Sequence, residues 1–151
     1  MKSLFMDDKY YMTMAMREAI MAADEGEGPV GAVVVCNGQV IAKAHNQTER
    51  LGDVTAHAEM LALTAAANTL GGKYLGDCTL YVTLEPCTMC AGAMRWSQLG
   101  RLVYGASDEK NGYRRFAADI MHPRTVVDNG VMEEDCAKIV TGFFKERRCS
   151  H

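Results

Sequence analysis

Two short stretches of the sequence carry residues that could bind a metal and move protons. His57 and Glu59 lie two positions apart in "TAHAEM", and Cys87 and Cys90 lie three positions apart in "EPCTMC". An imidazole and two thiolates form a donor set that suits zinc. Three protein ligands leave the fourth tetrahedral position for water, which is typical of catalytic zinc. The sequence therefore predicts one zinc ion held by His57, Cys87 and Cys90.

Glu59 is the residue expected to move protons. Zinc bound by two thiolates and a neutral imidazole carries no net formal charge, so it activates its water weakly and needs a nearby base. Glu59 is not required as a ligand and is free for that role. A second carboxylate, Glu85, precedes Pro86, which holds its backbone extended. We expect Glu85 to orient the turn at Cys87 rather than to react.

Both groups are expected at the N-terminal ends of helices, where amide groups and the helix dipole favour anions. Cys87 and Cys90 are spaced so that they share one helix face. His57 and Glu59 are about 200° apart around an ideal helix. They can therefore reach one pocket only near the helix end, for which Thr55 is the expected cap.

The remaining sequence predicts alternating helices and strands. A first helix is expected to open at Asp7 or Asp8 and to end before Gly26. Asn37-Gly38 is a favoured hairpin turn between two apolar runs. The other expected elements are a helix over 56–70, strands over 78–84 and 101–106, a short helix over 87–97, a strand fragment near 125–131 and a helix over 133–148. This order favours an α/β fold, a three-layer α/β/α sandwich with a mixed central sheet.

The composition supports a single domain over 1–151 and excludes some classes of function. The chain has 151 residues, 48% of them hydrophobic, and a net charge of −3, which does not favour general binding of polyanions. No apolar run is long enough to cross a membrane and no secretory signal is apparent, so we expect a cytoplasmic protein. Cys36, Cys78 and Cys136 are then expected to be buried rather than cross-linked.

The motifs also resemble a known family. H-x-E followed thirty positions later by P-C-x-x-C is a signature of zinc nucleobase deaminases. Together with "GPVGAVVV", "TLYVTLEPCTMCAGAM" and "VYGASDEK", it makes the chain similar to the bacterial tRNA-specific adenosine deaminases from about Glu27 to Arg148. The resemblance implies a cytidine deaminase-like fold. It also implies a homodimer with one zinc per subunit, which uses zinc-activated water to convert a wobble adenosine of tRNA, in an arginine anticodon arm, to inosine.

The resemblance implies roles for individual residues as well. Glu59 would shuttle protons, Asn46 would hydrogen-bond the nucleoside, and Asp108 would lie on an RNA-contacting loop. The backbone around Ala58 and Pro86 would position the edge of the base. Possible RNA contacts are Arg114, Arg115, Phe144, Lys145, Arg147 and Arg148. The segment "GYRRFAADIM" departs from the family, with basic and aromatic residues in place of smaller ones. Trp96 is expected in the core or at a dimer interface.

Three other readings remain open on the sequence alone. A zinc deaminase of a free base or small nucleoside, such as guanine or cytosine, would carry the same signature. An RNA-binding module with structural zinc would need a fourth protein ligand and would not need Glu59. A C-x-x-C redox protein would leave His57 and Glu59 unexplained.

Overall fold

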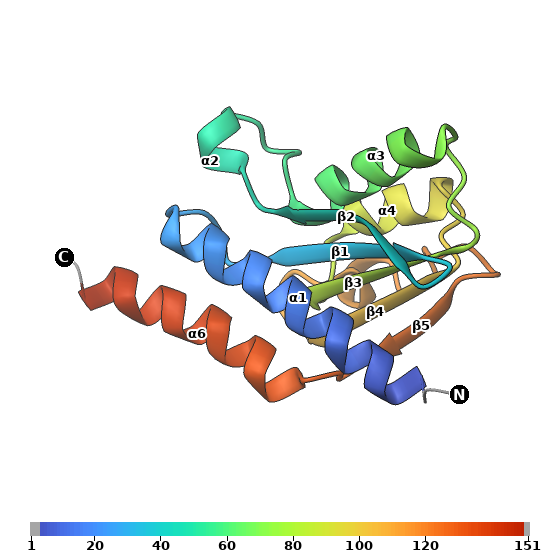
Figure 1. Cartoon of the computed structure of the whole chain (residues 1–151). Helices are drawn as coiled ribbons and strands as arrows, with labels where there is room; N and C mark the ends of the chain where they lie inside the picture. Colours follow the sequence, from blue (N-terminus) through green and yellow to red (C-terminus); the bar gives the residue numbers. More distant parts are fainter. Residues whose placement is uncertain (1–3, 150–151) are drawn as a thin grey trace.

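The structure is a computed structural model that describes residues 4–149, and side chains from 8 to 145. A five-stranded sheet lies between two layers of helices (Figure 1). One layer holds α1 (Leu4–Asp24) and α6 (Glu133–Cys149). The other holds α3 (Ala58–Leu70) and α4 (Thr88–Trp96). The predicted α/β/α sandwich is therefore confirmed.

The sheet is mixed, with strand order β2-β1-β3-β4-β5. Pairs β1–β2 and β1–β3 are antiparallel, whereas β3–β4 and β4–β5 are parallel. The parallel pairs follow from the helical crossover that each of them needs. The strand bounds are β1 (Gly31–Cys36), β2 (Gln39–His45), β3 (Cys78–Leu84), β4 (Arg101–Ala106) and β5 (Val126–Asn129).

The central strand β1 explains why both helix layers are needed. All six of its residues are buried, because α1 covers one face and α3 the other. A Cβ at Gly31 would overlap the carbonyl oxygen of Ala15, so α1 approaches this strand more closely than a side chain would allow. The hairpin from β1 to β2 turns at Asn37 and Gly38, with φ of 51° and 76°. These positive φ values confirm the turn predicted from this residue pair.

Two of the expected helix caps are wrong. Helix α1 begins at Leu4, before Asp7 and Asp8. Asp8 is instead buried and accepts two hydrogen bonds of 2.8 Å from the guanidinium of Arg101 on β4. Thr55 does not cap α3, because its hydroxyl donates to Asp53 and the N-cap is His57. The sequence also did not reveal two four-residue helices, α2 (Thr48–Leu51) and α5 (Tyr113–Phe116).

Several other side chains can be placed. Cys36, Cys78 and Cys136 are buried and free, as predicted. Trp96 is 81% exposed at the end of α4, which excludes it from the core of this chain. Among the described residues, no helix has both the length and the apolar character needed to cross a membrane.

Candidate active site

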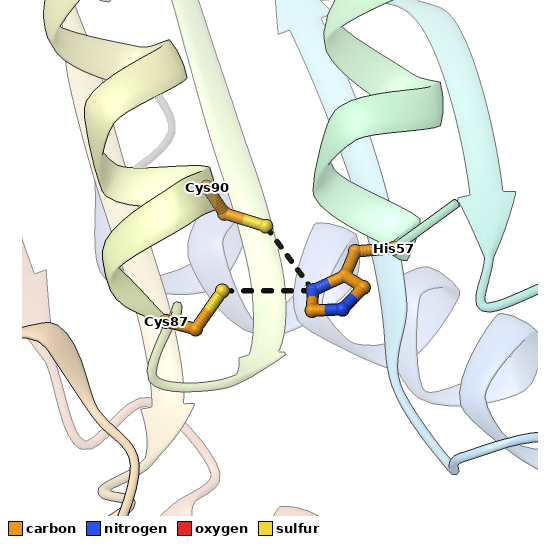
Figure 2. A group of neighbouring side chains, drawn as sticks. All are labelled: His57, Cys87 and Cys90. Carbon is orange, nitrogen blue, oxygen red and sulfur yellow. Dashed lines mark hydrogen bonds between the residues drawn. The ribbon is translucent and has the colours of Figure 1, made fainter. Parts of the chain in front are cut away.

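The three predicted metal ligands meet where two helices begin. His57 is the N-cap of α3 and Cys87 is the N-cap of α4, and both have extended backbone conformations. Cys90 lies one turn into α4. Figure 2 shows His57 facing the two thiols across the gap between the helices. His57 Nδ1 lies 3.6 Å from Cys87 Sγ and 3.4 Å from Cys90 Sγ.

These distances fit a zinc ion. Zn–S bonds of about 2.3 Å and Zn–N bonds of about 2.0 Å at a tetrahedral angle would separate nitrogen and sulfur by roughly 3.5 Å. The three donor atoms all lie within 4.8 Å of one another, and they form the one such group found among the described residues. The donor set is also one of those that hold zinc at catalytic sites with three protein ligands.

The three candidate ligands shift one another's pKa values, and only Cys87 is shifted toward its anionic form. The pKa of Cys87 is lowered to about 4, first by a hydrogen bond with Cys90 and then by its contact with His57. The pKa of Cys90 is raised by that same hydrogen bond and by burial. The pKa of His57 is raised, chiefly by its hydrogen bond with Cys87. The Cys87 thiolate therefore forms readily, whereas a metal ion would have to displace protons from Cys90 and His57 as it binds.

Glu59 borders the metal-ligating group and is almost fully buried, with 4% of its surface exposed. Burial is the main cause that raises its pKa, to about 7. A carboxyl group with a pKa near neutral pH can both accept and return a proton. The predicted general base is therefore placed next to the predicted metal ligands.

A cavity of about 200 Å³ opens beside these groups. Predicted site residues that line it are Asn46, His57, Glu59, Cys87 and Asp108. The sequence did not reveal that Val30, Leu84, Glu85 and Asn111 complete its wall. Ala58 and Pro86 are buried and do not line it. The N–H of Ala58 donates to Asn46, and the carbonyl of Pro86 accepts from Tyr113 at 2.9 Å.

Glu27 anchors the loop that leads from Asn46 to His57. It is 1% exposed, and its carboxylate accepts hydrogen bonds from the N–H groups of Glu49 and Arg50 at 2.9 and 2.8 Å. Burial acts to raise its pKa, but these hydrogen bonds outweigh burial and lower it. The ionised carboxylate thus caps the first turn of α2, which has no cap from its own N-cap residue, Gln47.

A larger groove of about 700 Å³ continues from the small cavity, with which it shares Val30, Leu84, Asp108 and Asn111. Its far wall is Phe144 on α6, whose side chain is 51% exposed. Lys145 is exposed beside Phe144. Arg147 and Arg148 lie outside the described side chains.

The two arginines of α5 differ in their surroundings. Arg115 is exposed and donates to the carbonyl oxygen of Lys110 at 2.9 Å. The guanidinium of Arg114 is instead bound to Glu85 and Ser107.

Another hollow, of about 740 Å³, lies between the N-terminal ends of α1 and α6. Its charged lining is mostly acidic, and of its two cations, Lys9 and Arg101, the latter is bound to Asp8 and Asp128. It contains none of the predicted ligands. We therefore place the site at the small cavity, where the metal donors and a buried carboxyl group meet.

Comparison with known proteins shows the family of this chain. Residues 6–148 match the family model of MafB19-like deaminases. A tRNA-specific adenosine deaminase of Agrobacterium fabrum is 43% identical over 144 residues, which cover 92% of this chain and 95% of that protein. One of Bacillus subtilis is 44% identical over 147 residues, which cover 93% and 91%.

Solved structures of deaminases are similar to this chain as well. One from work on A-to-I editing by tRNA:A34 deaminases at the wobble position of transfer RNA has a TM-score of 0.81 and 43% identity, covering 86% of this chain and 98% of that one. A guanine deaminase of Bacillus subtilis aligns with a TM-score of 0.63 and 38% identity, but over only 65% of this chain and 63% of that one. The likeness to the tRNA deaminase is thus the more extensive of the two.

Proposed function

Because this chain belongs to the MafB19-like deaminase family and to the tRNA-specific adenosine deaminases, we propose that it hydrolyses the wobble adenosine of a tRNA anticodon loop to inosine and ammonia. The observation that carries the proposal is the joint position of Glu59 and the three candidate ligands at one cavity. At about 200 Å³ the cavity is smaller than the pockets of drug-sized ligands. Its size is consistent with a single base turned out of its stack, which is easiest in an unpaired loop.

His57, Cys87 and Cys90 would hold one zinc ion per subunit. When bound there, zinc supplies a water molecule of lowered pKa as the nucleophile. Glu59 would accept a proton from the attacking water and pass it to the ring nitrogen next to the amino-bearing carbon of adenine. A second proton passes through Glu59 to the amino group, which leaves as ammonia. The buried carboxyl group suits both transfers, because its pKa of about 7 lies near the working pH.

Other residues hold the base and the RNA. Asn46 keeps its side-chain oxygen on Ala58, so its NH₂ group is the one it offers to the nucleoside. Ala58 and Pro86 act through the groups they bind, Asn46 and Tyr113, rather than by touching the base. Asp108 lies where the cavity meets the larger groove, so nucleotides next to the wobble position would pass it.

The groove would take the rest of the anticodon loop. The exposed ring of Phe144 can stack on a base, and Lys145 and Arg115 can neutralise phosphates. Arg147 and Arg148 are further candidates from the sequence. We propose an arginine tRNA as the substrate and a cytoplasmic homodimer as the working form. The exposed Trp96 is a candidate for the dimer interface, which sedimentation of a Trp96→Glu variant would test.

The test is inosine formation in a panel of synthetic anticodon stem-loops, with guanine, cytosine and free adenosine as competing substrates. We expect turnover of a stem-loop with adenosine at the wobble position and none of the free compounds. Turnover of guanine or cytosine without turnover of any stem-loop would replace this function with that of a free-base deaminase.

A further inference from the structure

The Glu85 carboxylate accepts four hydrogen bonds from residues 108–114, the segment that contributes Asp108 and Asn111 to the cavity wall. The Glu85 side chain is 2% exposed. Oε1 accepts from the backbone N–H of Asp108 at 3.0 Å and from Arg114 Nη2 at 3.1 Å. Oε2 accepts from the backbone N–H of Arg114 at 3.1 Å and from its Nε at 3.2 Å. All four donors belong to residues 108–114, so one buried carboxylate fixes both ends of this segment.

The packing around this contact leaves little freedom. A Cβ at Gly112 would overlap the Glu85 carboxylate, so the segment passes directly over it. The guanidinium of Arg114 also donates to Ser107 Oγ at 2.9 Å and lies 5.3 Å from the centre of the Tyr104 ring. Although 45% of the Arg114 side chain is exposed, its guanidinium is turned toward Glu85, Ser107 and the Tyr104 ring.

The same segment forms the substrate-facing wall. Asp108 and Asn111 line both the small cavity and the larger groove. Asp108 Oδ1 accepts the N–H groups of Lys110 and Asn111 at 3.2 and 3.0 Å, and its carbonyl accepts from Gly112 at 2.8 Å. The segment is thus a compact turn. Its C-terminal end is also held by Tyr113, which is buried and donates its N–H to the carbonyl of Pro86 at 2.9 Å, so loss of the Glu85 attachment would loosen the turn rather than release it.

We propose that Arg114 and Glu85 form a latch that holds the 108–114 segment in place for the substrate. Arg114 is then a positioning residue and not a phosphate contact. This inference rests on the proposed function for its effect on RNA, but the attachment itself can be measured without any substrate. Its variants are Arg114→Ala, Arg114→Lys and Glu85→Gln. Arg17→Ala, an exposed arginine on α1, is the control.

Hydrogen exchange tests the attachment directly. The backbone N–H groups of Asp108 and Arg114 donate to Glu85, so their hydrogens should exchange about tenfold faster in all three latch variants. Their exchange rates should be unchanged in Arg17→Ala. Zinc content should stay equal to that of the wild type. Unchanged exchange in the latch variants would overturn the proposal, whether or not the enzyme acts on RNA.

Kinetics on an anticodon stem-loop separate the two roles of Arg114. A latch predicts that KM rises about tenfold in Arg114→Ala and in Arg114→Lys alike, because lysine keeps the charge but cannot form the paired contact. It also predicts an unchanged slope of log KM against log salt. A phosphate contact predicts near-normal KM for Arg114→Lys and a slope lowered by about 0.7 in Arg114→Ala, and that result would overturn the latch.

A wild-type enzyme that leaves every stem-loop unchanged would count against the proposed function instead. The exchange result would still decide whether the latch exists.

Discussion

The side-chain oxygen of Asn46 accepts a hydrogen bond of 2.7 Å from the backbone N–H of Ala58, the first residue of α3. His57, the N-cap, makes no side-chain capping bond of its own. A residue twelve positions upstream therefore caps the helix that begins at the candidate zinc ligand. Asn46 joins the substrate cavity to the metal-ligating group in a way that its sequence context does not reveal.

Replacing Asn46 with alanine should affect both stability and substrate binding. Loss of a capping bond should lower the free energy of unfolding by about 1 kcal/mol. Loss of the side-chain NH₂ should raise KM for a stem-loop by about tenfold. Urea unfolding and steady-state kinetics measure the two effects. The control is Asn68→Ala, at an exposed position of α3. An equal effect of this substitution on stability and KM would contradict this role of Asn46.

Glu59→Gln should separate metal binding from catalysis. The amide keeps the shape of the carboxyl group but cannot take up a proton, so kcat should fall by about 10³-fold. Zinc content should remain at one per chain, because Glu59 is not a ligand. Metal analysis together with single-turnover deamination is the measurement. Loss of zinc along with activity would mean that Glu59 is a ligand rather than a proton shuttle.

Cys90→Ala should release the metal. Cys90 is fully buried and offers one of three donor atoms, so the variant should hold less than one zinc per chain. Saturating zinc at about 100 times its Kd would stabilise the wild type by about 2.7 kcal/mol, and this gain should be absent from the variant. Thermal unfolding with and without chelator shows the difference. Cys136→Ala, at another fully buried cysteine, should keep its zinc.

The Asp8–Arg101 pair should make stability depend on pH in acid. Burial acts to raise the pKa of Asp8, but hydrogen bonds from Arg101 and Tyr81 lower it below 3.8. A lowered folded-state pKa means that the stabilisation is complete above pH 3.8 and is lost as the pH falls further.

Asp8→Asn should accordingly cost about 2 kcal/mol at pH 7. The difference in the free energy of unfolding between this variant and the wild type should shrink below pH 3.8. Urea unfolding across this range tests both points. Asp24→Asn, at the exposed end of α1, is the control and should change the free energy of unfolding little at any pH. A loss of stability in Asp8→Asn that stays constant with pH would contradict the ion pair.

The sequence was sufficient for the order of the long elements and for the three donor residues that the fold brings together. Long helices and strands show a clear periodicity of apolar residues. The spacing of His57, Cys87 and Cys90 is typical of few arrangements other than a metal site. The sequence was not sufficient for α2 and α5, because four residues hold too little periodic pattern to be distinguished from loop. The helix caps failed for a related reason. Thr55 is a good cap by residue type, but the ligand His57 occupies that position and Asn46 supplies the bond.

The two buried glutamates show what local patterns cannot reveal. Glu27 binds the N–H groups of α2, more than twenty positions further along the chain. Nothing near Glu27 in the sequence signals this contact. Glu85 did give a signal, since a carboxylate at the end of an apolar strand must find partners once it is buried. Its partners could not be named, because residues 108–114 meet it only after β4 has paired with β3.

The starts of α3 and α4 supply the metal donors, whereas two separate loops, each bound by a buried acidic side chain, add Asn46, Asp108 and Asn111 to the cavity wall. Such a division lets evolution alter what the enzyme recognises while its reaction centre stays intact. The unusual "GYRRFAADIM" stretch begins inside the second of these loops, directly after Asn111, which lines the cavity. A lineage could therefore acquire new RNA preferences there without first losing its ability to deaminate.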